Sequence, residues 1–153
     1  MNSLLEIFQN KVLLISATSW FIAGVLKMLV ELRVNKVFSI SRIIGAGGMP
    51  SSHTSTVVSL VVALGYYSGL SSGVFAVATI LAIIVIHDAV GVRLETGKQA
   101  KVLNTMMFHS SAFKDLDFEK QLKEYVGHTP SQAFVGAIVG ILVSITMINL
   151  VFK

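Results

Sequence analysis

Four largely apolar stretches limit what this chain can fold into more than any other feature. They cover residues 12–32, 50–69, 74–86 and 129–152. A helix needs about 20 mostly apolar residues to cross the hydrocarbon core of a bilayer. The whole chain is 54% hydrophobic and only 13% charged, whereas about 25% of the residues of a soluble domain are charged. We therefore expect an all-α, polytopic membrane helical bundle with about four transmembrane helices.

The stretches between these helices are short or polar. Residues 66–73 have the composition of a tight turn, and residues 33–49 and 91–126 form polar connections. Within the second connection, residues 114–125 carry charges of both signs at helical spacing, which predicts a short amphipathic surface helix at the membrane's edge. No internal repeat or long linker divides the chain, so we expect residues 1–153 to form a single membrane-embedded domain.

The basic residues are distributed unevenly between the two predicted faces. If the helices alternate in direction, ten of the twelve Lys and Arg residues lie on the side of loops 33–52 and 88–128, and Lys11 and Lys153 lie on the other side. The positive-inside rule places the richer side in the cytoplasm. We expect a multi-pass protein of the cell membrane whose two termini are outside the cytoplasm. Because no dense basic run carries interleaved aromatic residues, nucleic acid is not an expected partner.

The most informative motif is Gly47-Gly48-Met49-Pro50-Ser51-Ser52-His53. It places backbone N–H groups, two hydroxyls and an imidazole at the start of a membrane helix, where free donors and the helix dipole favour an anion such as phosphate. Pro-Ser-Ser is also an ordinary helix start, so the motif alone does not decide between a site and a cap.

A second motif, Gly127-His128-Thr129-Pro130, again sets a histidine beside a helix start on the same predicted face. Two histidines beside two helix N-termini suggest phosphoryl transfer, in which one ring attacks phosphorus and the other protonates the leaving oxygen. The chain has no cysteine, so neither a thiolate nucleophile nor a Cys-based zinc site is available. A metal site built from His87, Asp88 and one motif histidine is less favoured, because no i, i+4 pair of ligands marks a helix face.

Together these motifs resemble those of a known superfamily. Pro50-Ser51-Ser52-His53 is similar to the Pro-Ser-Gly-His motif of the type 2 phosphatidic acid phosphatases and vanadium haloperoxidases. With the segments 87–93 and 127–130, the whole pattern resembles the divergent bacterial and plant branch of that superfamily. The resemblance implies a helical membrane fold and a histidine phosphoenzyme. We expect no cofactor and no metal.

The resemblance also implies roles for individual residues. His128 matches the nucleophile and His53 the general acid, and Gln132 stands where the superfamily has the aspartate that orients the nucleophile. The expected phosphate-binding residues are Lys27, Arg42, Ser51, Ser52, Arg93 and Asp88.

Two residues differ from the pattern of the superfamily. Gln132 can fix the tautomer of an imidazole but cannot offset the charge of an imidazolium, and Leu122 stands where the superfamily has an arginine. Arg93, five residues after Asp88, could replace that arginine as a bidentate phosphate ligand, or the two could form only a structural ion pair. Lys27 lies inside an apolar stretch, so its ammonium either reaches the interface or faces a polar site between helices.

The function expected from these features is that of a membrane phosphatase or phosphotransferase acting on a lipid phosphate or pyrophosphate. The alternative is a catalytically weak or inactive member of the fold that binds an anionic lipid head group or acts as a scaffold. A transporter is less favoured because the later helices carry no charge at mid-span. Gly65-x-x-x-Gly69 and Gly136-x-x-x-Gly140 are small-residue faces that suit close helix packing, including packing in a homo-oligomer.

Overall fold

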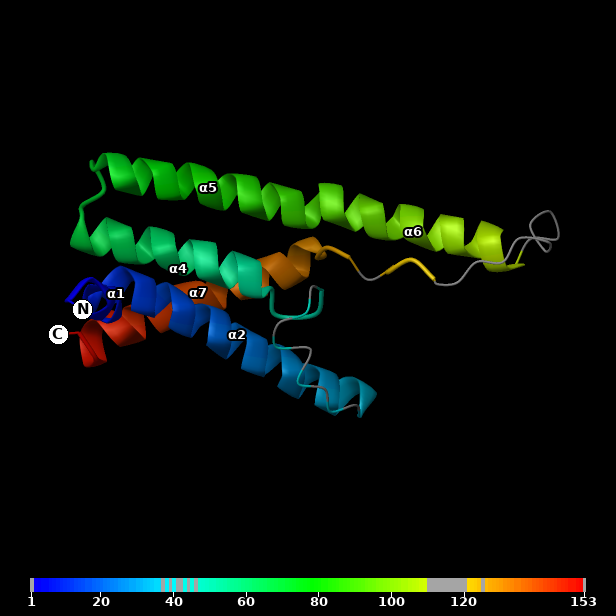
Figure 1. The fold of residues 1–153 in the computed structure, drawn as a ribbon, viewed down its shortest axis with the longest axis horizontal. Helices are drawn as coiled ribbons and strands as arrows, with labels where there is room; N and C mark the ends of the chain where they lie inside the picture. Colours follow the sequence, from blue (N-terminus) through cyan, green and yellow to red (C-terminus); the bar gives the residue numbers. More distant parts are fainter. Residues whose placement is uncertain are drawn as a thin grey trace.

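Helices make up nearly all the regular structure in the computed structural model, which describes residues 2–36, 38, 40, 43, 45, 47–109, 121–124 and 126–152. Labelled as in Figure 1, they are α1 (Asn2–Gln9), α2 (Lys11–Asn35), α4 (Ser52–Tyr67), α5 (Gly73–Val90), α6 (Val92–His109) and α7 (Pro130–Leu150). No strand occurs in these ranges, and the prediction of an all-α membrane bundle is confirmed.

Polar side chains fix where the long helices begin. The side chains of Asn10, Ser51, Ser72 and Thr129 each accept a hydrogen bond from a backbone N–H in the first turn of α2, α4, α5 and α7. These caps satisfy donors that a helix leaves without an internal partner. In α7, Gln132 completes a capping box with Thr129, and Pro130 occupies the first turn.

Three helical stretches are long and apolar enough to cross a membrane: Lys11–Asn35, Gly73–Phe108 and Pro130–Leu150. The 16 residues of α4 would span about 24 Å, and this helix lies between α2, α5 and α7. The four predicted apolar stretches therefore correspond to α2, α4, α5 and α7. Both termini lie at one end of this bundle, and α4 and α7 begin toward the other end (Figure 1).

The bundle carries its large apolar side chains outside and small polar ones inside. Val77 and Phe134 are 69% and 68% exposed, as expected for side chains that face lipid. Between α2 and α4, the buried hydroxyls of Ser19 and Ser55 lie 2.7 Å apart. Hydroxyl pairs of this kind, together with small side chains, hold membrane helices together where no hydrophobic driving force acts between them.

Two glycines bring the start of α7 against the start of α4. A Cβ atom on Gly136 would stand 2.5 Å from the carbonyl oxygen of Ser51, and one on Gly140 would stand 2.6 Å from that of Ser55. The small-residue face of α7 is therefore occupied within the chain. A homo-oligomer, which stays a proposal, would need another face.

The polar connection predicted over residues 91–126 contains a helix in its first half. Residues 92–109 form α6, which continues the direction of α5, so that Gly73–Phe108 makes a helical stretch of 36 residues (Figure 1). At 1.5 Å per residue this stretch is about 54 Å long, well beyond the ~30 Å hydrocarbon core. Most of the predicted surface helix 114–125 lies outside the described residues, and residues 121–124 are not helical.

Candidate active site

The two motif histidines lie side by side. His53 is in the first turn of α4 and His128 comes two residues before α7, and their ring centroids are 6.1 Å apart with the ring planes inclined at 60°. The close packing of α4 on α7 at Gly136 explains this meeting of segments 75 residues apart in the chain, as does a hydrogen bond from the Ser51 N–H to the Gln132 carbonyl.

His128 is fixed by its backbone and by its ring. Its N–H donates to the carbonyl of Ala89 at the end of α5 (2.9 Å), and its side chain is 3% exposed. Ring Nδ1 lies 3.3 Å from Oε1 of Gln132, which also accepts the Thr129 N–H. Because an amide oxygen only accepts, this contact places the proton on Nδ1 and leaves Nε2 as the basic nitrogen.

The surroundings favour the neutral form of His128. Burial lowers the pKa of His128 below its usual value, and the nearby His53 and Lys27 lower it further, while hydrogen bonds to the Gln132 side chain and the Gly48 backbone act in the opposite direction. A neutral imidazole with a free nitrogen is the form that a nucleophile requires.

Asp88 and Arg93 lie where α5 passes into α6. Arg93 Nε and Asp88 Oδ2 form an ion pair of 2.5 Å, and their side chains are 48% and 39% exposed. A pair this exposed contributes only about 0–1 kcal/mol to stability. Asp88 therefore positions the guanidinium of Arg93, but so weak a pair can rearrange easily. The guanidinium remains accessible to an anion.

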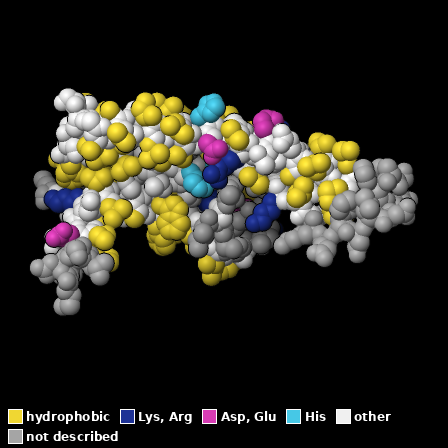
Figure 2. Space-filling view, turned by 45° about the horizontal axis from the view of Figure 1, so that its top comes forward, with side chains coloured by type: hydrophobic (Ala, Val, Ile, Leu, Met, Phe, Trp, Pro, Cys, Tyr) yellow, Lys and Arg dark blue, Asp and Glu magenta, His cyan; other side chains and the backbone are white. Residues whose placement is uncertain are grey.

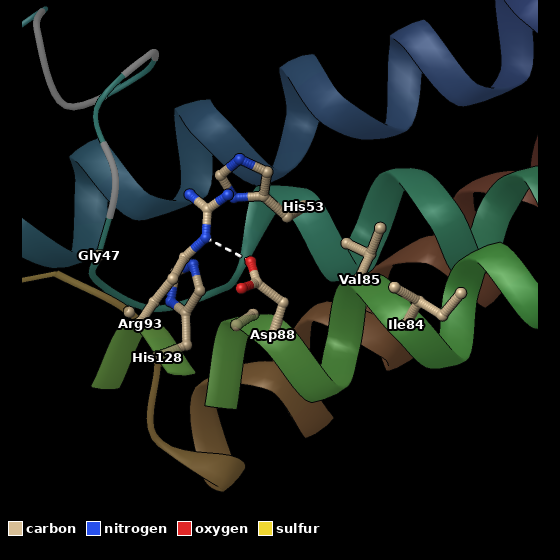
Figure 3. A pocket seen from close by; sticks show the side chains of 9 residues that line it. Gly47, His53, Ile84, Val85, Asp88, Arg93 and His128 are labelled. Atoms are coloured by element: carbon tan, nitrogen blue, oxygen red, sulfur yellow. Dashed lines mark hydrogen bonds and ion pairs between the residues drawn. The ribbon is translucent and has the colours of Figure 1, made fainter. Parts of the chain in front are cut away.

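These side chains surround one cavity of about 240 Å³. It is lined by Gly47, His53, Ile84, Val85, Asp88, Ala89, Arg93, Gly127 and His128. Figure 3 shows that the polar side chains converge at one end, while Ile84 and Val85 extend along α5 at the other. Ile84 is 59% exposed on the outer surface of the bundle, so the cavity joins a charged site to a lipid-facing wall.

The surface around the cavity shows the same division. In Figure 2, histidine, basic and acidic side chains gather near the middle of the molecule, beside a broad hydrophobic band over the bundle. Within the described ranges, no three His, Asp or Glu side chains are placed to share a metal ion.

Comparison with known proteins shows which family the chain belongs to. The sequence pattern of the Divergent PAP2 family matches residues 8–143, which include both histidine motifs, Lys27 and Arg93. The chain belongs to the Divergent PAP2 family. It is also similar to the "Uncharacterized membrane protein YuiD" of Bacillus subtilis (strain 168), with 35% identity over 153 residues that cover 94% of this chain and 97% of YuiD. No solved structure matches significantly.

In this Divergent PAP2 protein, the predicted phosphate-cradling serines are buried and do not line the cavity. Ser51 is fully buried, and its Oγ accepts hydrogen bonds from the N–H and hydroxyl of Thr54. Ser52 is 5% exposed, and its Oγ has no hydrogen-bond partner among the described residues. Ser51 thus acts as the cap of α4, which was the alternative interpretation of the motif.

The three predicted cations of this family member occupy different positions. Arg93 lines the cavity, and Arg42 lies outside the described residues. Lys27 is 3% exposed and donates from Nζ to the carbonyl of Gly45 at 2.6 Å, and it is not among the described residues that line the cavity. Burial excludes the interpretation in which this ammonium reaches the interface. Lys27 faces the polar site between helices.

Asn104 on α6, which the sequence offered only as a residue that could line the site, is 4% exposed. Its amide bonds to both the N–H and the carbonyl of Leu122 (2.9 and 2.8 Å) and to Oε1 of Glu124 (2.9 Å). These contacts hold residues 121–124, which lead toward His128, against α6. Gly97 of α6 allows the backbone of Glu124 to approach closely. Nothing in the local spacing marks Asn104, because its partners are 18 and 20 residues away.

Proposed function

We propose that this Divergent PAP2 protein is a membrane phosphatase or phosphotransferase that acts on a lipid phosphate or pyrophosphate through a histidine phosphoenzyme. The observation that supports this most directly is the cavity in which His53, His128 and Arg93 meet beside a lipid-facing apolar wall. A phosphate group would lie at the polar end, and its acyl or prenyl chain would follow Ile84 and Val85 toward the bilayer.

The two histidines have different surroundings, which supports different roles for them. Nε2 of His128 attacks phosphorus as the bond to the leaving oxygen breaks, and His53 donates a proton to that oxygen. Water then attacks the phosphohistidine, giving its proton to His53 and releasing inorganic phosphate and free His128. Arg93 offsets the charge on the phosphoryl oxygens with its planar pair of donors.

The second candidate function is binding of an anionic lipid head group without turnover. It is favoured by one observation: the partner of His128 is the neutral Gln132, at 3.3 Å, longer than the usual range of about 2.7–3.2 Å for such bonds. A neutral amide stabilises an imidazolium less than a carboxylate would.

We place the site on the cytoplasmic face of the cell membrane on the basis of the uneven basic charge.

The test is phosphate release from a panel of lipid phosphates and diphosphates by the detergent-purified protein. Wild type is compared with His128→Ala, His53→Ala and a matched control, His87→Ala, because His87 is exposed and outside the cavity lining. We expect activity in wild type and in His87→Ala only. After incubation with labelled substrate and denaturation, acid-labile label should be trapped in wild type and His53→Ala but not in His128→Ala. Label in His128→Ala would contradict the assignment, and no activity in wild type would favour the binding function.

A further inference from the structure

The glycine-rich loop, here residues 45, 47 and 48, has neighbours in both the cavity and α2. Gly47 lines the cavity with His53 and His128. Gly45 and Gly48 lie against Lys27 of α2. Gly47 and Gly48 have φ values of +80° and +85°, a backbone conformation that favours glycine. The loop therefore has little intrinsic rigidity and needs an external contact to fix its shape.

Lys27 makes that contact in two ways. Its Nζ donates to the Gly45 carbonyl at 2.6 Å, and its Cδ and Cγ atoms would stand 3.0 and 3.1 Å from a Cβ on Gly48. The side chain is 3% exposed and is not among the described residues that line the cavity. These contacts hold the loop at two of its described residues, Gly45 and Gly48.

We infer that Lys27 is a positioning residue, which fixes the glycine-rich loop beside His53 and His128 through its contacts with Gly45 and Gly48. The inference deepens the proposed phosphoryl transfer and rests on it for its catalytic consequence. The loop reaches the proposed nucleophile, because Gly47 lines the same cavity as His128. Lys27 would thus act on the nucleophile through the loop.

The first test needs no turnover. Diethyl pyrocarbonate modification is followed by peptide mass spectrometry in the detergent-purified protein, with the exposed His53 as an internal reference for the buried His128. In Lys27→Met, which removes the ammonium but keeps an unbranched apolar side chain, the rate at His128 relative to His53 should rise about tenfold as the loop moves away. Lys27→Arg retains a donor and a charge, so its ratio should stay close to wild type.

The second test separates positioning from direct binding by kinetics. A misplaced loop should lower kcat by about 100-fold with little change in KM, because displacements near 1 Å cost about that much. Gly48→Ala, whose new Cβ meets Lys27, should show the same pattern, and Lys27→Met should cost little more in that background. Gly69→Ala is the matched control: Gly69 has φ of +86° and nothing within 4 Å of an added Cβ.

The outcomes separate the inference from the proposed function. A higher KM with unchanged kcat in Lys27→Met would identify a direct phosphate ligand and overturn the inference, as would an unchanged modification ratio. Should wild type show no turnover, the modification ratio still decides whether Lys27 positions the loop. If Lys27→Met does not fold, Gly48→Ala must exceed Gly69→Ala in both modification ratio and loss of kcat, and equal effects would refute the inference.

Discussion

Replacing Gly136 by alanine tests whether the contact between α4 and α7 sets the geometry of the site. The added Cβ would stand 2.5 Å from the Ser51 carbonyl oxygen and 3.1 Å from the Ser51 Cβ, whereas ordinary contacts begin near 3.4 Å. The two helices must separate by about 1 Å to relieve this overlap, and overpacking of this kind costs about 1–3 kcal/mol. Because these helix ends carry His53 and His128, the same separation should lower kcat by about 100-fold.

The assay is thermal unfolding in detergent together with lipid phosphate turnover. Gly73→Ala provides the control, because Gly73 begins α5 and an added Cβ there meets nothing within 4 Å. We expect Gly73→Ala to change stability by no more than about 1 kcal/mol, the difference between these residues in helix propensity. If Gly136→Ala unfolds at the same temperature as Gly73→Ala and retains its kcat, the close contact does not position the histidines and the reasoning fails.

Three further predictions concern charge, the α6 segment and topology. The pKa of His128 is lowered, so activity should persist as the pH falls below about 6.5, the usual histidine value. Gln132→Asp adds a negative charge that raises this pKa, so its pH–activity profile should lose activity at a higher pH, with kcat equal to wild type or higher; an unmoved profile would contradict this. Asn104→Ala breaks three hydrogen bonds and should destabilise the protein by about 1–3 kcal/mol, with faster hydrogen exchange in residues 121–128. Unchanged exchange would show that Asn104 does not hold this segment against α6. In intact cells, an impermeant thiol reagent should label Ser71→Cys but not Lys98→Cys, and the reverse pattern would invert the orientation.

The apolar stretches and caps of the fold were predictable from the sequence because both signals are local. The apolar runs became α2, α4, α5 and α7, and Ser51 and Thr129 cap helices where the sequence placed helix starts. α6 was not predicted, because residues 92–109 lack an apolar run. Its stability comes in part from partners distant in sequence, including the segment that Asn104 binds. A local pattern does not report such contacts.

The structure brings His53, His128 and Arg93 to one cavity, as expected from their shared face, but it separates other residues that the sequence grouped with them. Ser51 and Lys27 were expected around phosphate because their types suit that task. Their side chains instead bond to Thr54 and to the loop backbone. Residue type and spacing indicate that a group is near a site; which atoms it contacts there depends on packing.

The charges around Gln132 give a physical reason for a neutral residue at this position. Among the described residues at the site, Arg93 is already paired with one carboxylate, that of Asp88, and Lys27 supplies positive charge from its place against the loop. A second carboxylate at position 132 would stabilise the imidazolium of His128, but it would also oppose a phosphate group that carries negative charge. Gln132 fixes the tautomer without this repulsion. Gln132→Asp should therefore raise KM even where kcat is equal or higher, and a lower KM would show that phosphate charge does not limit binding at this site.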